Sequence, residues 1–330
     1  MALPVDGRTI GNIYATTFDA KIPEIIDGFF NSNSLFVRLN SRGKLTYDGG
    51  NEIRSTFMYT GIGGGSYTRG VSFDTSFKEF LTDLILQWKQ NYVPINMDGL
   101  DRAKNQGVSK IIDYMDALAE AAGMTIADNI GTQLFQDAGT SLGVSTDIDG
   151  LLEAISATNT YAGINRGGGD AIATACQSYI NSVGGAFNLP MLNTAWGSLV
   201  FGNKKVDLII TTQTIWNKIW ERTQPMQRFN DSTSADLAKL GFKSFDFNGA
   251  DVVVDSHCPT GVIYLLNTEF MEYWVCKGKD IQRRSREFGF ANAAGGFPVF
   301  NMDATVDQLI TYSNLVVKGP RYSGRISSVT

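Results

Sequence analysis

The sequence predicts an α+β protein with three parts: an extended N-terminal region, one long helix, and a mixed α/β unit. Three observations support this prediction. Residues 34–75 are strand-like and punctuated by glycine, residues 101–136 carry apolar side chains at steps of three and four, and helical and strand-like segments alternate from about residue 170 onward. A chain of 330 residues with 43% hydrophobic content can bury a sizeable core, in one large domain or two.

The N-terminal region offers little surface to bury. Residues 1–33 are irregular in pattern and have little reason to fold alone. Leu35, Val37 and Leu39 recur at every second position, which predicts a strand. Residues 61–70 read GIGGGSYTRG and are poor in large apolar side chains. We therefore expect a hairpin-like excursion with a mobile tip there.

The middle of the chain carries the longest helical pattern. Residues 77–93 fit either a helix or a strand, closed by Pro94 and the Asp98-Gly99 pair. Apolar side chains at helical spacing then predict a helix over residues 101–136, with Asp101 as N-cap and a length of roughly 50 Å. Gly123 and Gly131 interrupt it, and we expect them to bend the helix or to let another backbone approach closely.

The second half of the chain alternates between helical and strand-like periodicity. Helices are expected at 170–183 and 212–221. Strands are expected at the segments 205–211, 250–255, 261–266, 271–276, 304–317 and 325–329.

Charge and composition narrow the class of protein. The net charge of −5 does not attract nucleic acid or an anionic membrane overall. We find no signal peptide and no apolar run of the roughly 20 residues that a membrane span needs, so we expect a soluble protein made in the cytoplasm. Cys176, Cys258 and Cys276 are widely spaced and read as buried or idle thiols.

Candidate catalytic motifs are weak. GIGGGS lacks the lysine of a phosphate-binding loop, and Gly167-Gly168-Gly169 precedes Asp170, which would repel phosphate. His257, the single histidine, is adjacent to Cys258, and such neighbours make a poor nucleophile–base pair. We expect no cofactor and no metal, while carboxylate chemistry stays open as an alternative.

The charge distribution is uneven. Residues 101–160 hold nine acidic and three basic residues, whereas residues from 281 onward hold six basic and three acidic ones. The sharpest basic cluster is Arg283, Arg284 and Arg286. We favour ion pairs with the acidic long helix, and contact with packaged nucleic acid or a neighbouring subunit is the alternative.

The order of these parts resembles the major capsid proteins of tailed bacteriophages, which have the Hong Kong 97-like fold. The resemblance covers essentially the whole chain and depends on layout more than on any single motif. It is carried by the long helix, by VDLIITTQTIWNKIWE (206–221), by GADVVVDSHCPTGVIYLLNTEFMEYWV (249–275) and by QLITYSNLVVKGPRYSGRISSV (308–329).

The resemblance implies a domain division. Residues 1–33 would be the N-terminal arm, 34–77 the extended β-hairpin loop, 78–147 with 282–330 the peripheral domain with its spine helix, and 148–281 the axial α/β domain. The residues implied in contacts between subunits lie in the loop: Gly61, Gly63, Gly64, Gly65, Tyr67 and Arg69. Adaptation of the subunit is expected at this loop and at Gly123 and Gly131.

The resemblance also implies function and partners. The protein would be a structural protein of the virion, not an enzyme, that forms hexamers and pentamers of an icosahedral shell around double-stranded DNA. A portal, a separate scaffold protein and decoration proteins would be its partners, with DNA contacted weakly and no membrane. The strand signals beginning near Leu35 leave no room for a fused scaffold segment. The rivals are the shell of a cellular nanocompartment with the same fold, a carboxylate-based enzyme, and a tail tube protein.

Overall fold

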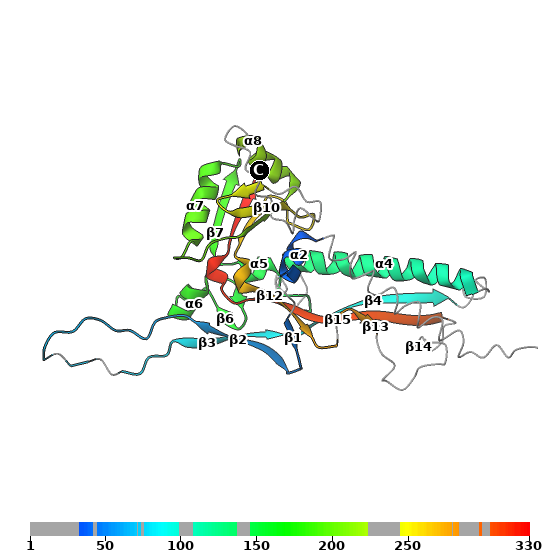
Figure 1. Ribbon diagram of the computed structural model, residues 1–330, viewed down its shortest axis with the longest axis horizontal. Helices are drawn as coiled ribbons and strands as arrows, with labels where there is room; N and C mark the ends of the chain where they lie inside the picture. Colours follow the sequence, from blue (N-terminus) through cyan, green and yellow to red (C-terminus); the bar gives the residue numbers. More distant parts are fainter. Residues whose placement is uncertain are drawn as a thin grey trace, which may run out of the picture.

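The computed structural model describes residues 33–41, 45–70, 72–73, 76–98, 108–136, 146–223, 245–278, 280–283, 297–298 and 304–330. Figure 1 shows three parts that meet near the middle of the molecule. A long hairpin extends from one end, a long helix lies along two long strands toward the other end, and a compact α/β unit stands above the junction. The three predicted parts are therefore all present.

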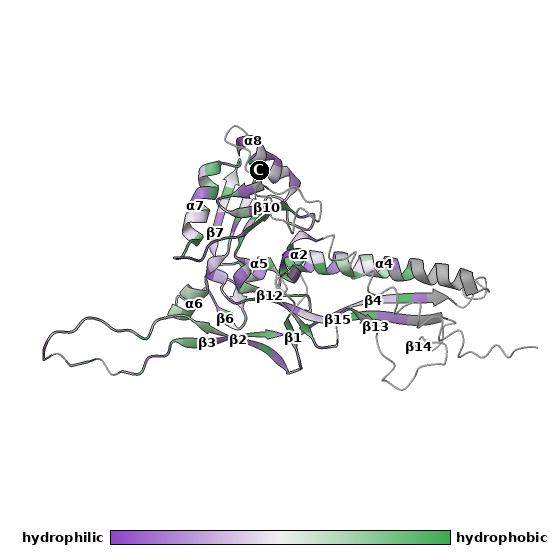
Figure 2. Cartoon of the chain, in the orientation of Figure 1, coloured by the Kyte–Doolittle hydropathy of each residue, from purple (hydrophilic) through white to green (hydrophobic). Residues whose placement is uncertain are grey.

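The long helix is α4 (Val108–Phe135), about 42 Å long at 1.5 Å per residue. Its described second half buries one stripe at helical spacing, which includes Ala122, Ile126, Ile130 and Leu134. Hydrophobic and hydrophilic residues alternate along this described half accordingly (Figure 2). The predicted start, with Asp101 as N-cap, lies outside the described residues.

A six-stranded sheet lies beneath α4. Its centre is β15 (Ala304–Val317), which pairs antiparallel with β4 (Lys89–Asp98) along ten residue pairs and with β12 (Met271–Cys276) beyond them. The remaining members are short: β1 (Leu45–Tyr47), β13 (Gln282–Arg283) and β14 (Phe297–Pro298). Strands far apart in sequence thus support the helix together.

The prediction that Pro94 closes its segment was wrong. The strand β4 runs through Pro94, which lies opposite Gln308 of β15. Among the described residues β4 pairs only with β15 and is therefore an edge strand, the place in a sheet where proline is tolerated.

A second sheet forms the α/β unit. Its order is β7 (Tyr179–Gly185), β16 (Gly324–Val329), β11 (Ile263–Leu266), β8 (Leu208–Thr211), β10 (Ala250–Val254) and β9 (Phe245–Phe247). Ile209 and Leu265 face one core with helices α7 (Leu189–Leu199) and α8 (Gln213–Thr223). Ile210 and Tyr264 face a second core that also contains α4. Burial on both faces explains the continuous apolar runs of these strands.

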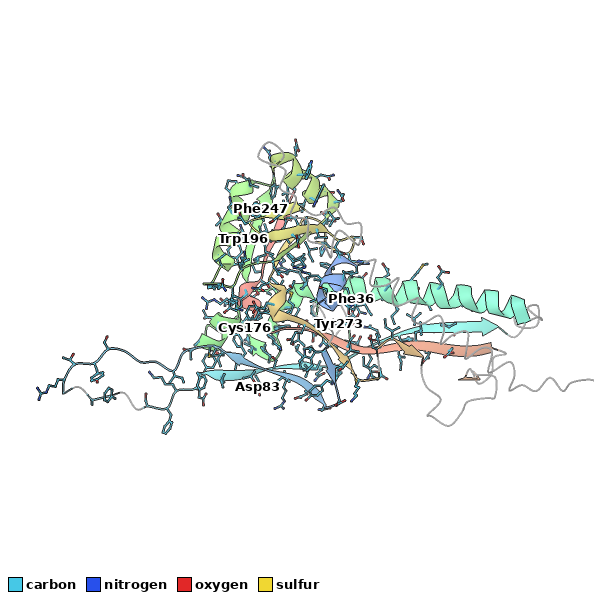
Figure 3. The ribbon with its side chains drawn as sticks, in the orientation of Figure 1. Phe36, Asp83, Cys176, Trp196, Phe247 and Tyr273 are labelled. Atoms are coloured by element: carbon cyan, nitrogen blue, oxygen red, sulfur yellow. The ribbon has the colours of Figure 1, made fainter. Side chains whose placement is uncertain are left out.

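Helix α2 (Ser34–Ser41) replaces the strand expected at Leu35, Val37 and Leu39. The side chain of Asn33 caps the helix, because its Oδ1 accepts the N–H of Phe36 at 3.1 Å. Leu35, Phe36 and Leu39 are buried, a helical spacing, and the Phe36 ring meets Tyr273 of β12 edge-on at 4.8 Å (Figure 3). The apolar Phe36 breaks the alternation that a half-buried strand requires.

The segment predicted as one helix at 170–183 divides into two elements. Helix α6 is Ala171–Cys176, and β7 begins at Tyr179. Between them, Ser178 donates its N–H to Ser156 O and its hydroxyl to Pro320 O, which holds the chain extended. Helix α7, which the sequence analysis did not predict, packs Trp196 edge-on against Phe247 of β9 (Figure 3).

The other predicted strands and helices of the α/β unit are confirmed, with ends that shift by a few residues. The short elements that link α4 to this unit are α5 (Leu151–Ala154), β5 (Thr160–Tyr161) and β6 (Ile164–Asn165), and two 3₁₀ turns follow at Thr268–Phe270 and Pro320–Tyr322.

A buried polar network fixes the central strand to the start of α5. The side chain of Asn314 donates to Asp149 Oδ2 at 2.7 Å and to Gln87 O at 2.8 Å, and it accepts the N–H of Asp149 at 3.1 Å. Lys89 Nζ lies 3.1 Å from the other oxygen of Asp149. The network therefore joins β4, β15 and the end of the hairpin.

Replacing Asn314 with alanine should destabilise the subunit by about 2–3 kcal/mol. The change leaves a carboxylate oxygen of the buried Asp149 and the buried N–H groups of Asp149 and Leu315 without this partner, and it removes the bond to Gln87 O. Buried polar groups that lose a partner are costly. Urea unfolding measures the effect. Asn217→Ala is the matched control, since Asn217 is exposed and its amide oxygen accepts a hydrogen bond from the exposed Gln213. An equal loss in both variants would contradict the network's importance.

Candidate assembly surface

The hairpin begins as a paired ribbon. Strands β2 (Glu52–Met58) and β3 (Leu81–Gln87) pair antiparallel from Glu52–Gln87 to Met58–Leu81. The ambiguous segment 77–93 is therefore strand from Leu81 onward, in β3 and the first half of β4. Ile53, Leu84 and Leu86 are buried, so one end of the ribbon is anchored in the body.

Beyond β2 and β3 the chain continues as a long loop that leaves the body (Figure 1). Tyr59 holds its base, donating its hydroxyl to Glu79 O at 2.7 Å. The described residues from 60 to 79 are exposed. A Cβ added at Gly61 or Gly65 would have no atom within 4 Å, and Gly63 and Gly64 have positive φ of 88° and 158°. The predicted excursion is confirmed, and glycine suits its backbone.

Large apolar side chains are unusually exposed on this hairpin. The exposed fractions are 66% for Met58, 64% for Ile62, 70% for Tyr67, 68% for Phe73 and 106% for Phe77. Only one ring pair, Tyr67 with Phe73 at 5.0 Å, relieves this exposure among the described residues. Several large apolar side chains left exposed on one segment are typical of a surface that another molecule covers.

A second apolar surface lies on the six-stranded sheet. Val93 and Ile95 of β4 are buried, on the face that α4 covers, whereas Tyr92 beside them is 65% exposed. On β1 Leu45 and Tyr47 are also exposed, and Tyr47 packs against Trp274 with ring centroids 5.6 Å apart. The sheet thus presents aromatic side chains on the face opposite α4.

The two predicted helix glycines are both buried in α4. A Cβ on Gly131 would lie 2.8 Å from Cε1 of His257 and 2.9 Å from Nδ2 of Asn33. Gly131 therefore permits close approach, although of two side chains and not of another backbone. Whether Gly123 and Gly131 allow adaptation of the subunit stays a prediction.

His257 and Cys258 do not cooperate. Cys258 Sγ points to Pro259 O and Val262 O, and burial raises the pKa of its thiol, so the thiol stays neutral. His257 instead contacts Asp128 and Asp255. Ser34 lies nearby, but its hydroxyl donates to Asp255 and not to His257. In a serine activated by histidine the hydroxyl donates to the imidazole instead. This cluster was missed because its members are far apart in sequence.

The remaining candidates are the cysteines and the side chains that could bind a metal ion. The three cysteines are free, as expected, and Cys176 and Cys258 are buried. Within the described residues no group of three or more His, Cys, Asp and Glu side chains is arranged to hold a metal ion.

Arg283 belongs to β13, while Arg284 and Arg286 lie outside the described residues, so the ion pairs with α4 stay a prediction. In the same described part, no helix is long and apolar enough to cross a membrane.

Known structures share this architecture. The capsid asymmetric unit of cyanophage A-1(L) matches with a TM-score of 0.66 at 18% identity, covering 91% of this chain and 93% of that one. The capsid of the native GTA particle matches with a TM-score of 0.60 at 10% identity, covering 88% and 90%. No family model and no curated protein matches the chain.

A third structure is the virus-like particle from Pyrococcus furiosus, with a TM-score of 0.50 and 12% identity over 95% of this chain and 99% of that one. These likenesses cover nearly the full length of each chain, and the neighbours are subunits of assembled shells. The chain therefore has the capsid-protein fold, as the sequence predicted.

Proposed function

We propose that this chain is the major capsid protein of a tailed bacteriophage, which assembles into the hexamers and pentamers of an icosahedral shell enclosing double-stranded DNA. The observation that carries the proposal is the apolar hairpin, which leaves the body of its own subunit and exposes Tyr67, Phe73 and Phe77. Because an isolated subunit gains nothing from such an arm, a second subunit is the natural partner.

Assembly through the hairpin would be multivalent. Each subunit offers one apolar hairpin and one aromatic sheet face, around Tyr92 and Tyr47, and several weak contacts made at once give a stable closed shell. The glycines at 61–65, with Tyr67 and Arg69 beyond them, supply the adaptable part of the loop, since hexamers and pentamers require slightly different paths.

We assign the parts of the fold as follows. Residues 1–33 are the arm, and the extended loop ends near residue 77 but begins after α2, because that helix packs in the body. The peripheral domain is 78–147 with 282–330, and the axial domain is 148–281. Two strands are exchanged between them: β12 pairs with β15 in the first sheet, and β16 pairs with β11 in the second.

The proposal places the protein in the shell of the virion, after synthesis in the host cytoplasm. A portal, a separate scaffold protein and decoration proteins are the further partners that the resemblance implies. The net charge of −5 suits a container that confines DNA without gripping it. The function is structural, and the proposal needs no enzymatic activity.

A cellular nanocompartment shell is the second candidate, because a virus-like particle from a cellular organism, Pyrococcus furiosus, has a similar fold. The contents of the particle distinguish the two. Particles purified from the native source by sedimentation should carry DNA that resists external nuclease, with an absorbance ratio typical of nucleic acid. Protein cargo without DNA would support the nanocompartment, and a small oligomer at every concentration would contradict both.

A further inference from the structure

His257 lies where three elements meet. It follows β10 in the turn toward β11, and its side chain is only 14% exposed. Its Nε2 is 3.1 Å from Asp128 Oδ1 on α4, and its Nδ1 is 3.3 Å from Asp255 Oδ1 in its own turn. The imidazole therefore bridges the long helix and the α/β unit.

Asp255 extends the bridge to α2. Its second oxygen, Oδ2, accepts the hydroxyl of Ser34 at 2.8 Å and the N–H of Leu35 at 3.4 Å. Gly131 completes the arrangement, because only a residue without a Cβ lets the ring lie so close to α4. The first turn of α2, the second half of α4 and the end of β10 are thus joined through two side chains, those of His257 and Asp255.

The chemistry of the bridge depends on protonation. An ionised carboxylate only accepts hydrogen bonds, so His257 must donate to Asp128 from Nε2 and to Asp255 from Nδ1. The imidazolium has both N–H groups, whereas neutral imidazole has one. When the imidazolium loses one of its two N–H protons, the nitrogen without a proton would point its lone pair at a carboxylate, and that hydrogen bond would be lost.

We propose that His257 is a protonation-controlled latch, which ties α4 to α2 and the α/β unit when it is charged and releases one of these bonds when it is neutral. The side chain of Asp255 is 1% exposed and is held by the hydrogen bond from Ser34, whereas the side chain of Asp128 is 76% exposed and can turn to solvent. The bond to α4 is therefore the one that opens. The latch is a property of the subunit and holds whether or not the subunit forms a shell.

Within the described part of the chain, few charged groups lie near the latch. Helix α4 presents Asp128, and the turn presents Asp255. Helix α2 contains one charged residue, Arg38, which pairs with Asp207 at 3.6 Å. The neighbouring thiol of Cys258 is neutral because burial raises its pKa.

The pH window follows from these groups. The hydrogen bond to Asp255 raises the pKa of His257 above its ordinary value near 6.5, and Asp128 adds to this against the effect of burial. Burial would raise the pKa of Asp255, but the hydrogen bonds from His257 and Ser34 outweigh it and lower that pKa. The latch is thus fully formed below pH 6.5, opens as pH rises through the folded pKa of His257, and fails again in acid, where Asp255 takes up a proton.

Nuclear magnetic resonance tests the latch directly, because the chain has one histidine and an untagged, ¹³C-histidine-labelled sample gives one imidazole Cε1–H signal. The signal of the folded full chain should titrate above pH 6.5, and in urea near 6.5. Asp128→Asn should lower the folded value. Asp83→Asn removes an exposed charge of the same type from the hairpin strand β3 and should leave the folded pKa of His257 unchanged (Figure 3).

Urea unfolding supplies the coupled readout. The unfolding equilibrium constant of Asp128→Asn divided by that of the wild type should be larger at pH 5.5 than at pH 8.5, by about tenfold for each unit of pKa that Asp128 adds. The ratio for Asp83→Asn should be the same at both. A histidine that titrates at or below 6.5 in the folded chain, or a ratio for Asp128→Asn that does not change with pH, would overturn the latch.

Discussion

A variant with Tyr67, Phe73 and Phe77 all changed to serine should fold like the wild type and fail to form shells. The three rings are at least 68% exposed, so the subunit loses little burial of its own. Each ring buried against a neighbour is worth about 1.5–3 kcal/mol, and because every subunit in a shell repeats the contact, the loss removes assembly altogether. Sedimentation velocity measures the assembled fraction, and circular dichroism checks the fold.

The matched control changes exposed apolar side chains outside the hairpin. Met124 on α4 is 62% exposed and Val200 after α7 is 39% exposed, and serine at both should leave assembly within a fewfold of wild type. Shells that form normally from the hairpin variant would sink the assignment of the hairpin as the assembly arm. Loss of shells in both variants would point to general surface hydrophobicity instead.

Gly150→Ala, which adds one methyl group, should lower the free energy of unfolding by more than about 4 kcal/mol. We expect this to be the largest loss from any single added methyl group in the body of the subunit. Its backbone, at φ −79° and ψ 179°, suits any residue, so conformation is not the reason. The added Cβ would collide with the carbonyl oxygens of Gln133 and Gln136 and come within 3.0 Å of that of Leu134, at the end of α4. Backbone atoms cannot turn aside, so α4 and α5 would have to separate.

Gly197→Ala should have the opposite effect on the stability of the subunit. Gly197 lies inside α7 with no atom within 4 Å of an added Cβ, so alanine should stabilise the subunit by up to about 1 kcal/mol through helix propensity. Thermal and urea unfolding of the two variants test the pair. If Gly150→Ala were as stable as the wild type, the close packing of α5 on the end of α4 would be wrong.

The sequence was sufficient where a pattern is local. The stripe containing Ala122, Ile126 and Ile130 is legible at steps of four, and glycine at 61–65 marks a segment that cannot bury itself. Helix α2 was mistaken for a strand because three alternating apolar residues outweighed Phe36, whose burial against β12 depends on tertiary packing.

The proposed assembly surface was only partly predictable. The sequence named Tyr67 and the loop glycines as candidates, but not Phe73 and Phe77, because only the structure shows that these two rings are largely exposed. The bridge from Asp128 through His257 to Ser34 spans residues more than 100 positions apart, which no local pattern reports. The same holds for β4 and β15, whose ten pairs join distant strands.

Electron microscopy of the purified protein, after sedimentation has separated the large species, tests the central claim most directly. The account predicts closed shells, or hexameric and pentameric rings, in which the hairpin of one subunit lies on the body of the next. A uniform small oligomer that does not change with concentration or with added scaffold protein would contradict it.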